Sequence, residues 1–128
     1  KKRDKKLFKE IKNIKFFEFE FDLSKKIASF QAVINHLYPK LYKYLNSGIL
    51  CESIAVGRPL LTPRYTNLSN YIEENKNGIL YDYSDSSQIA DGIFSLTANY
   101  SKYKKNSENL AKAWEEINGL NKIVELTL

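Results

Sequence analysis

Residues 45–63, LNSGILCESIAVGRPLLTP, restrict the fold more than any other stretch of the chain. Ser47 is a favourable N-cap, because its hydroxyl can accept a hydrogen bond from an amide of the first helical turn. The helix is expected to end at Gly57, since glycine readily adopts the left-handed conformation that stops a helix. Pro59 blocks its continuation, and the apolar residues that follow predict a short buried strand. A helix that leads directly into a buried strand is typical of a parallel α/β sheet.

Strands and helices alternate on both sides of this unit. The residue patterns predict strands at 14–21, 31–38 and 79–83. They predict helices at 1–11, 22–29, 67–75 and 120–128, and two more helices that begin near Asp85 and at Ser101. Thr66 or Asn67 is expected to cap the helix at 67–75, and Asn77-Gly78 to form its left-handed end. This order of elements predicts an α/β fold with a parallel sheet and flanking helices.

The bulk composition narrows the class of protein. A chain of 128 residues that is 43% hydrophobic is one domain's worth of sequence and can bury a core. The net charge of +5 is concentrated, because eight of the twenty Lys and Arg lie within the first fifteen residues. The rest of the chain is nearly balanced in charge, so a basic face for nucleic acid is not expected.

The numbers of cysteines and histidines exclude a disulfide-bonded domain and an ordinary zinc-binding domain. Cys51 is the only cysteine, so an internal disulfide is impossible, and a reducing, cytoplasmic setting is expected. Its place on the apolar side of the predicted helix favours a buried, unreactive thiol. One cysteine and one histidine, His36, cannot form an ordinary zinc site.

The start of the Ser47 helix admits two interpretations. In the first, the helix simply packs on the sheet, and Glu52 is a solvated side chain at its flank. In the second, the amides of Gly48, Ile49 and Leu50 face an anion, which the helix dipole favours, and Glu52 accepts from sugar hydroxyls. His36 and Tyr38 would lie nearby, since ligands of open α/β sheets collect beyond the carboxyl ends of the strands.

The residue pattern of this helix and strand also resembles a family signature. The pattern S-G-I-L-C-E-S-I-A-V-G-R-P-L-L-T-P is similar to the E-x7-E element of retaining, nucleotide-sugar-dependent glycosyltransferases of the GT-B fold, group 1 type. The stretch LSNYIEENKNGILYDY, residues 68–83, is similar to the acidic helix, N-G turn and short strand that follow in that family. The resemblance extends over residues 45–96.

The resemblance implies roles for six residues. Glu52 matches the second glutamate, which binds the nucleotide ribose, and Ser47, Gly48, Ile49 and Leu50 match the backbone that binds the diphosphate. The first glutamate, which contacts the donor sugar, falls on Tyr44. The family needs no metal, and no cofactor is expected.

The resemblance also implies an architecture and partners. Residues 1–128 would be a fragment of the C-terminal Rossmann-like domain, with upstream strands and an N-terminal domain absent. The donor would be a nucleoside-diphosphate sugar, and the absent domain would bind a glycan or lipid-linked acceptor, as in polysaccharide biosynthesis. The basic run at residues 1–15 would allow peripheral contact with the inner face of a membrane.

Two other functions remain open at this point. One is a non-catalytic binding or interaction domain of the same fold, which Tyr44 in place of an acid suggests, because a phenol lacks a carboxylate's charge. The other is a module that binds anionic surfaces through residues 1–15.

Overall fold

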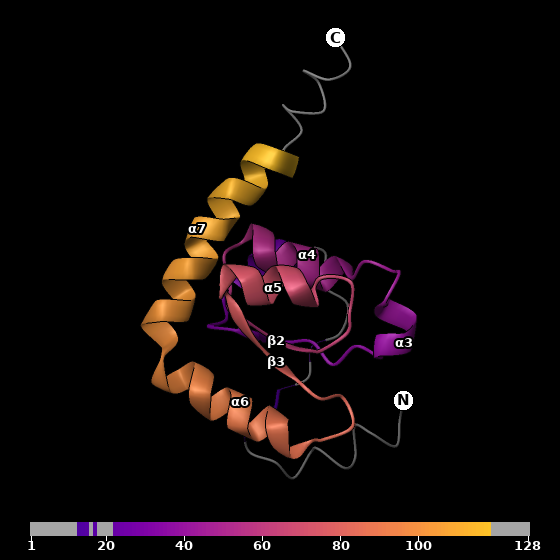
Figure 1. Ribbon diagram of the computed structural model, residues 1–128. Coiled ribbons are helices and arrows are strands. Elements are labelled where there is room, and N and C mark those ends of the chain that lie inside the picture. The colour runs from indigo at the N-terminus through magenta and orange to yellow at the C-terminus, as the bar shows by residue number, and fades with distance from the viewer. Residues whose placement is uncertain (1–12, 16, 18–21, 119–128) are drawn as a thin grey trace.

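The computed structural model describes residues 13–15, 17 and 22–118, and it is an α/β fold of the Rossmann-like type (Figure 1). Its sheet consists of β1 (Val33–Ile34), β2 (Leu60–Pro63) and β3 (Gly78–Tyr81), in the order β1-β2-β3. Both pairings are parallel, with Val33 opposite Leu60 and Leu60 opposite Gly78. The predicted fold class is therefore confirmed at this level.

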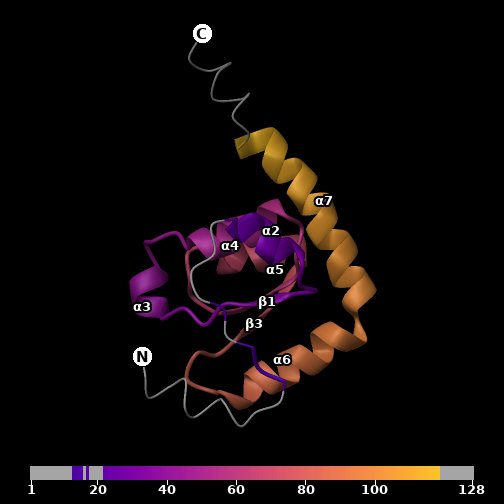
Figure 2. The same ribbon diagram turned by 180° about the vertical axis from the view of Figure 1, so that it is seen from behind.

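Helices cover both faces of the sheet. They are α2 (Leu23–Ala28), α3 (Pro39–Tyr42), α4 (Gly48–Ala55), α5 (Ser69–Asn75), α6 (Ser87–Ala98) and α7 (Tyr100–Asn118). In Figures 1 and 2, α2, α4 and α5 lie on one face of the sheet and α6 lies on the other. The long helix α7 follows α6 and packs against α4 and α5.

The main core lies between the sheet and the α4–α5 layer. Its buried members are Leu50, Ile54, Leu60, Ile72 and Leu110, the last of which comes from α7. Burial of this kind is the main favourable contribution to folding, at roughly 25 cal/mol per Å² of apolar surface. On the other face Gly92 of α6 lies directly against the side chain of Leu61, so the helix approaches the sheet closely.

The unit at residues 45–63 folds as predicted. Ser47 is the N-cap of α4, and its hydroxyl accepts a hydrogen bond from the amide of Leu50 at 3.4 Å. Gly57 has a φ of +67°, so it occupies the left-handed region just after the helix. All four residues of β2 are buried, as expected for the central strand of a parallel sheet.

The end of α5 corrects the prediction for Asn77-Gly78. The left-handed residue is Lys76, with a φ of +51°, whereas Gly78 is the first residue of β3. A Cβ on Gly78 would lie 2.4 Å from the backbone oxygen of Leu60. The glycine is therefore needed for close packing between strands, and Lys76 adopts the left-handed conformation that ends the helix.

Two further boundaries differ from the prediction. The strand expected at residues 31–38 is only Val33–Ile34. The segment of β2 that pairs with it lies between Pro59 and Pro63, and neither proline has an amide hydrogen for the ladder. Neither Thr66 nor Asn67 caps α5. The hydroxyl of Thr66 donates to the carbonyl of Pro63, and the side-chain amide of Asn67 donates to the side-chain oxygen of Asn46.

Several predicted elements lie wholly or mostly outside the described residues. These are the helices at 1–11 and 120–128 and most of the strand at 14–21, of which residues 14, 15 and 17 are described and belong to no helix or strand. Within the described part of the chain, no helix combines the length and the apolar character needed to cross a membrane.

Candidate functional site

The first turn of α4 lies at the carboxyl edge of the sheet. Asn35, which directly follows β1, donates from its side-chain amide to the hydroxyl of Ser47 at 3.2 Å, and both residues are buried. In Figure 1 this edge is on the right, near α3, while α7 lies at the opposite end of the strands. Sequence reasoning did not identify Asn35, because the contact joins residues twelve positions apart.

The three predicted anion-binding amides differ in their availability. The amide of Leu50 donates to the hydroxyl of Ser47, and its side chain belongs to the core. The amides of Gly48 and Ile49 have no acceptor among the described residues. Gly48 is exposed, and a Cβ built on it would meet no atom within 4 Å. The first turn of α4 is therefore open to solvent at two of its amides, where the positive end of the helix dipole lies.

Glu52 lies one turn further along α4, on the side that faces α2. Its Oε2 atom accepts a hydrogen bond from the hydroxyl of Ser24, near the start of α2. Because this contact uses one carboxylate oxygen, the other remains able to accept from a ligand hydroxyl. Glu52 is half-buried, so its side chain is partly shielded from solvent but still accessible to it.

Tyr44 stands apart from the other predicted residues. Its side chain is 78% exposed, and the ammonium group of Lys43 lies 5.3 Å from its ring centroid. Its hydroxyl has no hydrogen bond to the described residues, so Tyr44 is a solvent-exposed aromatic side chain in the loop before α4.

An aromatic cluster, formed by His36, Tyr38, Tyr81 and Tyr83, lies at the same edge of the sheet. The ring of His36 stacks on Tyr83 with centroids 4.3 Å apart, and its Nδ1 atom lies 2.7 Å from the hydroxyl of Tyr81. Tyr38 contacts Tyr83 at 5.5 Å between centroids. His36 and Tyr38 are exposed, so the cluster offers aromatic surface to a planar or sugar ligand.

Tyr81 keeps its proton to a higher pH than an ordinary tyrosine. Burial raises the pKa of Tyr81 to about 12, and the neighbouring Tyr83 contributes in the same direction. Sequence reasoning placed His36 and Tyr38 at this edge but missed Tyr81 and Tyr83. The available signal was the alternation of tyrosines at the end of the strand predicted for residues 79–83.

The loop before α4 is tied to the loop after β2. The backbone amide of Asn67 donates to the carbonyl of Tyr42 at 2.8 Å, and its side chain donates to Asn46. Tyr65, in the same turn, has a φ of +64° and is 78% exposed. A non-glycine residue in this region is uncommon and marks a constrained turn.

Cys51 supplies no nucleophile to this edge. The side chain is half-buried, and burial, together with the neighbouring Glu52, raises the pKa of its thiol. A raised pKa leaves less thiolate at neutral pH, and the thiolate is the reactive form. No group of three His, Cys, Asp or Glu side chains that could hold a metal ion occurs among residues 13–15, 17 and 22–118.

We compared the chain with models of known protein families, with curated proteins and with solved structures, and none of the three comparisons gave a match. The functional assignment therefore rests on the residues of the carboxyl edge and on the resemblance of their pattern.

Proposed function

We propose that the chain is the nucleotide-sugar-binding lobe of a retaining glycosyltransferase of the GT-B type. The observation that supports this most directly is the first turn of α4. Its N-cap, Ser47, is fixed by Asn35, and the exposed Gly48 leaves the helix start open at the carboxyl edge of a parallel sheet. Ligands of open α/β sheets bind at this edge.

The diphosphate would be bound by the α4 backbone. The amides of Gly48 and Ile49 are free to donate to phosphate oxygens, and the helix dipole adds a favourable interaction with negative charge. Because glycine has no side chain, a phosphate can approach the backbone closely at this position. The same interactions stabilise the nucleoside diphosphate as it leaves, which makes the catalytic contribution of this lobe electrostatic.

The rest of the donor would extend to either side of the diphosphate. The free oxygen of Glu52 accepts from ribose hydroxyls, while its other oxygen is oriented by Ser24. The exposed rings of His36 and Tyr38 provide a stacking surface for the base or the sugar. The acceptor would bind a separate domain, so the activity expected of this chain alone is binding without transfer.

Titration with uridine, guanosine and adenosine diphosphates, followed by calorimetry, tests the proposal. We expect one of them to bind, and Gly48→Glu to weaken binding by at least about tenfold, because the new carboxylate repels the diphosphate. A carboxylate in the first turn of a helix is favourable for stability, so the variant should fold. Gly48→Gln, which has the same shape without the charge, is the matched control and should weaken binding less.

Two results would contradict the proposal. One is the absence of binding to all three nucleotides in a folded sample. The other is equal affinity of the Gly48→Glu variant and the unaltered chain, since a diphosphate at the α4 amides must experience that charge.

A second candidate is a non-catalytic domain of the same fold, and Tyr44 favours it. The phenol stands where the family has a carboxylate, and it points to solvent beside Lys43. This domain would also bind a nucleotide at α4. The two functions separate in the protein that includes the acceptor domain, because only the first one predicts sugar transfer there.

A further inference from the structure

The outer edge of β3 is a second feature that the proposed function does not use. Leu60 donates its amide to the carbonyl of Asn77 at 3.1 Å, and Arg64 donates to the carbonyl of Tyr81 at 2.8 Å. Asn77 and Tyr81 therefore direct their backbone groups toward β2. Because successive residues of a strand alternate, the amide and carbonyl groups of Gly78 and Leu80 face the opposite way. No described residue forms a hydrogen bond with them.

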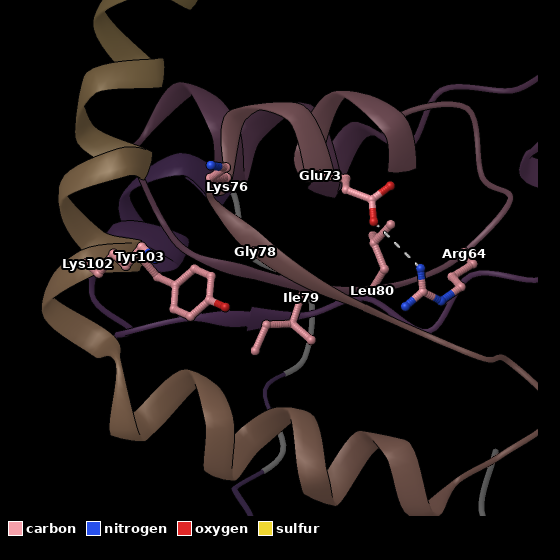
Figure 3. A pocket seen from close by; sticks show the side chains of 8 residues that line it. All are labelled: Arg64, Glu73, Lys76, Gly78, Ile79, Leu80, Lys102 and Tyr103. Atoms are coloured by element: carbon pink, nitrogen blue, oxygen red, sulfur yellow. Dashed lines mark ion pairs between the residues drawn. The ribbon is translucent and has the colours of Figure 1, made fainter.

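A recess of about 240 Å³ follows this edge. It is lined by Arg64, Glu73, Lys76, Gly78, Ile79, Leu80, Lys102 and Tyr103, and we refer to it as the β3-edge recess. Figure 3 shows Tyr103 pointing from α7 toward the strand at one end, with Arg64 and Glu73 at the other. Its floor is the strand itself, so any ligand in it lies against free backbone groups.

The charge of the β3-edge recess is positive. Arg64 forms an ion pair with Glu73 at 3.8 Å, and both side chains remain largely exposed. Lys76 and Lys102 have no acidic partner among the described residues. As far as the described residues go, the recess thus has two lysines without an acidic partner beside an unpaired strand edge, while Ile79 and Leu80 supply half-buried apolar surface.

We propose that the β3-edge recess binds an extended acidic segment of a partner protein by strand addition. The backbone of the segment pairs with Gly78 and Leu80, its carboxylates lie against Lys76 and Lys102, and its alternate apolar side chains contact Ile79 on the opposite face of the sheet. Strand addition obtains affinity from the main chain and selectivity from alternate side chains, which is the combination present here. The four residues of β3 span roughly 13 Å, enough for a short motif. This inference is independent of the nucleotide site.

A short dye-labelled peptide in which glutamate alternates with valine is a suitable probe, and fluorescence anisotropy at low ionic strength measures its binding to the full chain. We expect saturable binding that weakens with added salt, since the charged contacts are exposed. We also expect new protection from hydrogen exchange at the amides of Gly78 and Leu80. The amides of Ile79 and Tyr81, which already face β2, should change little.

Two controls separate strand addition from simple charge attraction. Lys102→Glu places an acid in the first turn of α7, which the helix dipole tolerates, and should reduce affinity by about tenfold. Lys112→Glu makes the same charge change on an exposed residue roughly 15 Å further along α7, and should have little effect. A peptide methylated at alternate backbone nitrogens retains its carboxylates but cannot pair with the strand, and should bind poorly.

The proposal is overturned if the peptide does not bind at low ionic strength. It is equally overturned if the methylated peptide binds as well as the parent, or if Lys112→Glu reduces affinity as much as Lys102→Glu. In those cases the lysines serve only to discourage unwanted pairing at an exposed edge.

Discussion

At the scale of single residues, Tyr81 shows how the aromatic cluster contributes to stability as well as to the site. The side chain is 1% exposed, and its hydroxyl forms a hydrogen bond with His36 at 2.7 Å. A buried tyrosine is stable only while neutral, because ionisation would place a charge away from water. The pKa of about 12 therefore links the stability of the fold to alkaline pH.

Replacing Tyr81 by phenylalanine tests this link. Near neutral pH the variant should lose about 1 kcal/mol of unfolding free energy, the usual value for one hydrogen bond. In the unfolded chain Tyr81 loses its proton near pH 10, whereas in the folded chain it does so only near pH 12. The unaltered protein should therefore lose stability relative to Tyr81→Phe as the pH rises above 10.

Urea unfolding of both proteins at neutral pH and at about pH 10.5 measures the difference, the higher value being just above the ordinary tyrosine pKa. Tyr65→Phe is the control, because that side chain is 78% exposed and removing its hydroxyl should change the unfolding free energy little. A Tyr81→Phe effect of the same size at both pH values would contradict the expectation.

At the scale of elements, two glycines with similar sequence surroundings have opposite roles. A Cβ on Gly78 would lie 2.4 Å from the carbonyl oxygen of Leu60 and 2.9 Å from the side chain of Ile72. A Cβ on Gly48 would meet nothing within 4 Å. The first glycine allows β3 to pack between β2 and α5, and the second keeps the start of α4 accessible.

The two alanine variants should differ accordingly. Gly78→Ala is expected to cost about 3 kcal/mol, because the new methyl group meets backbone that cannot move aside easily. Gly48→Ala should leave the unfolding free energy unchanged or slightly raised, since alanine favours helix and has space there. Thermal unfolding followed by circular dichroism compares the two variants. Equal losses of unfolding free energy would contradict the expected clash at Gly78.

These glycines also show which features of the fold can be predicted from the sequence. Gly57 and its left-handed conformation were predictable, because Pro59 follows at once and leaves no way to continue the helix. Asn77-Gly78 also follows a predicted helix but has no proline after it, and there the glycine serves a contact with Leu60, which lies far away in the chain. Ser47 could be recognised as an N-cap from its neighbours, whereas Asn35, which positions it, could not. Local chemistry is readable from the sequence; contacts between distant segments are not.

At the scale of the whole molecule, α7 connects the layers. It contacts α4, α5 and α6, contributes Leu110 to the core, and places Trp114 against Tyr71 with ring centroids 5.8 Å apart. Gly57, at the far end of α4 from the site, packs against Ser107 and Glu108. Because α7 occupies that end of the sheet, it does not cover the carboxyl edge.

This arrangement predicts that α7 unfolds together with the sheet. Trp114 is the only tryptophan, so its fluorescence reports on the contact between α5 and α7. We expect its transition in urea to coincide with that of the circular dichroism signal, as in a single cooperative unit. A fluorescence change that precedes the loss of secondary structure would mean that α7 detaches first.

The neighbouring residues Asn35 and His36 have a mechanical consequence. One side chain reaches the start of α4, and the other reaches the tyrosines at the end of β3. A single planar peptide unit joins them, and such a unit turns as a rigid plate. Because the two side chains stand on adjacent Cα atoms, a shift of this short backbone segment displaces both of them. The start of α4 and the aromatic cluster at the end of β3 are thus both held by two successive residues of the chain.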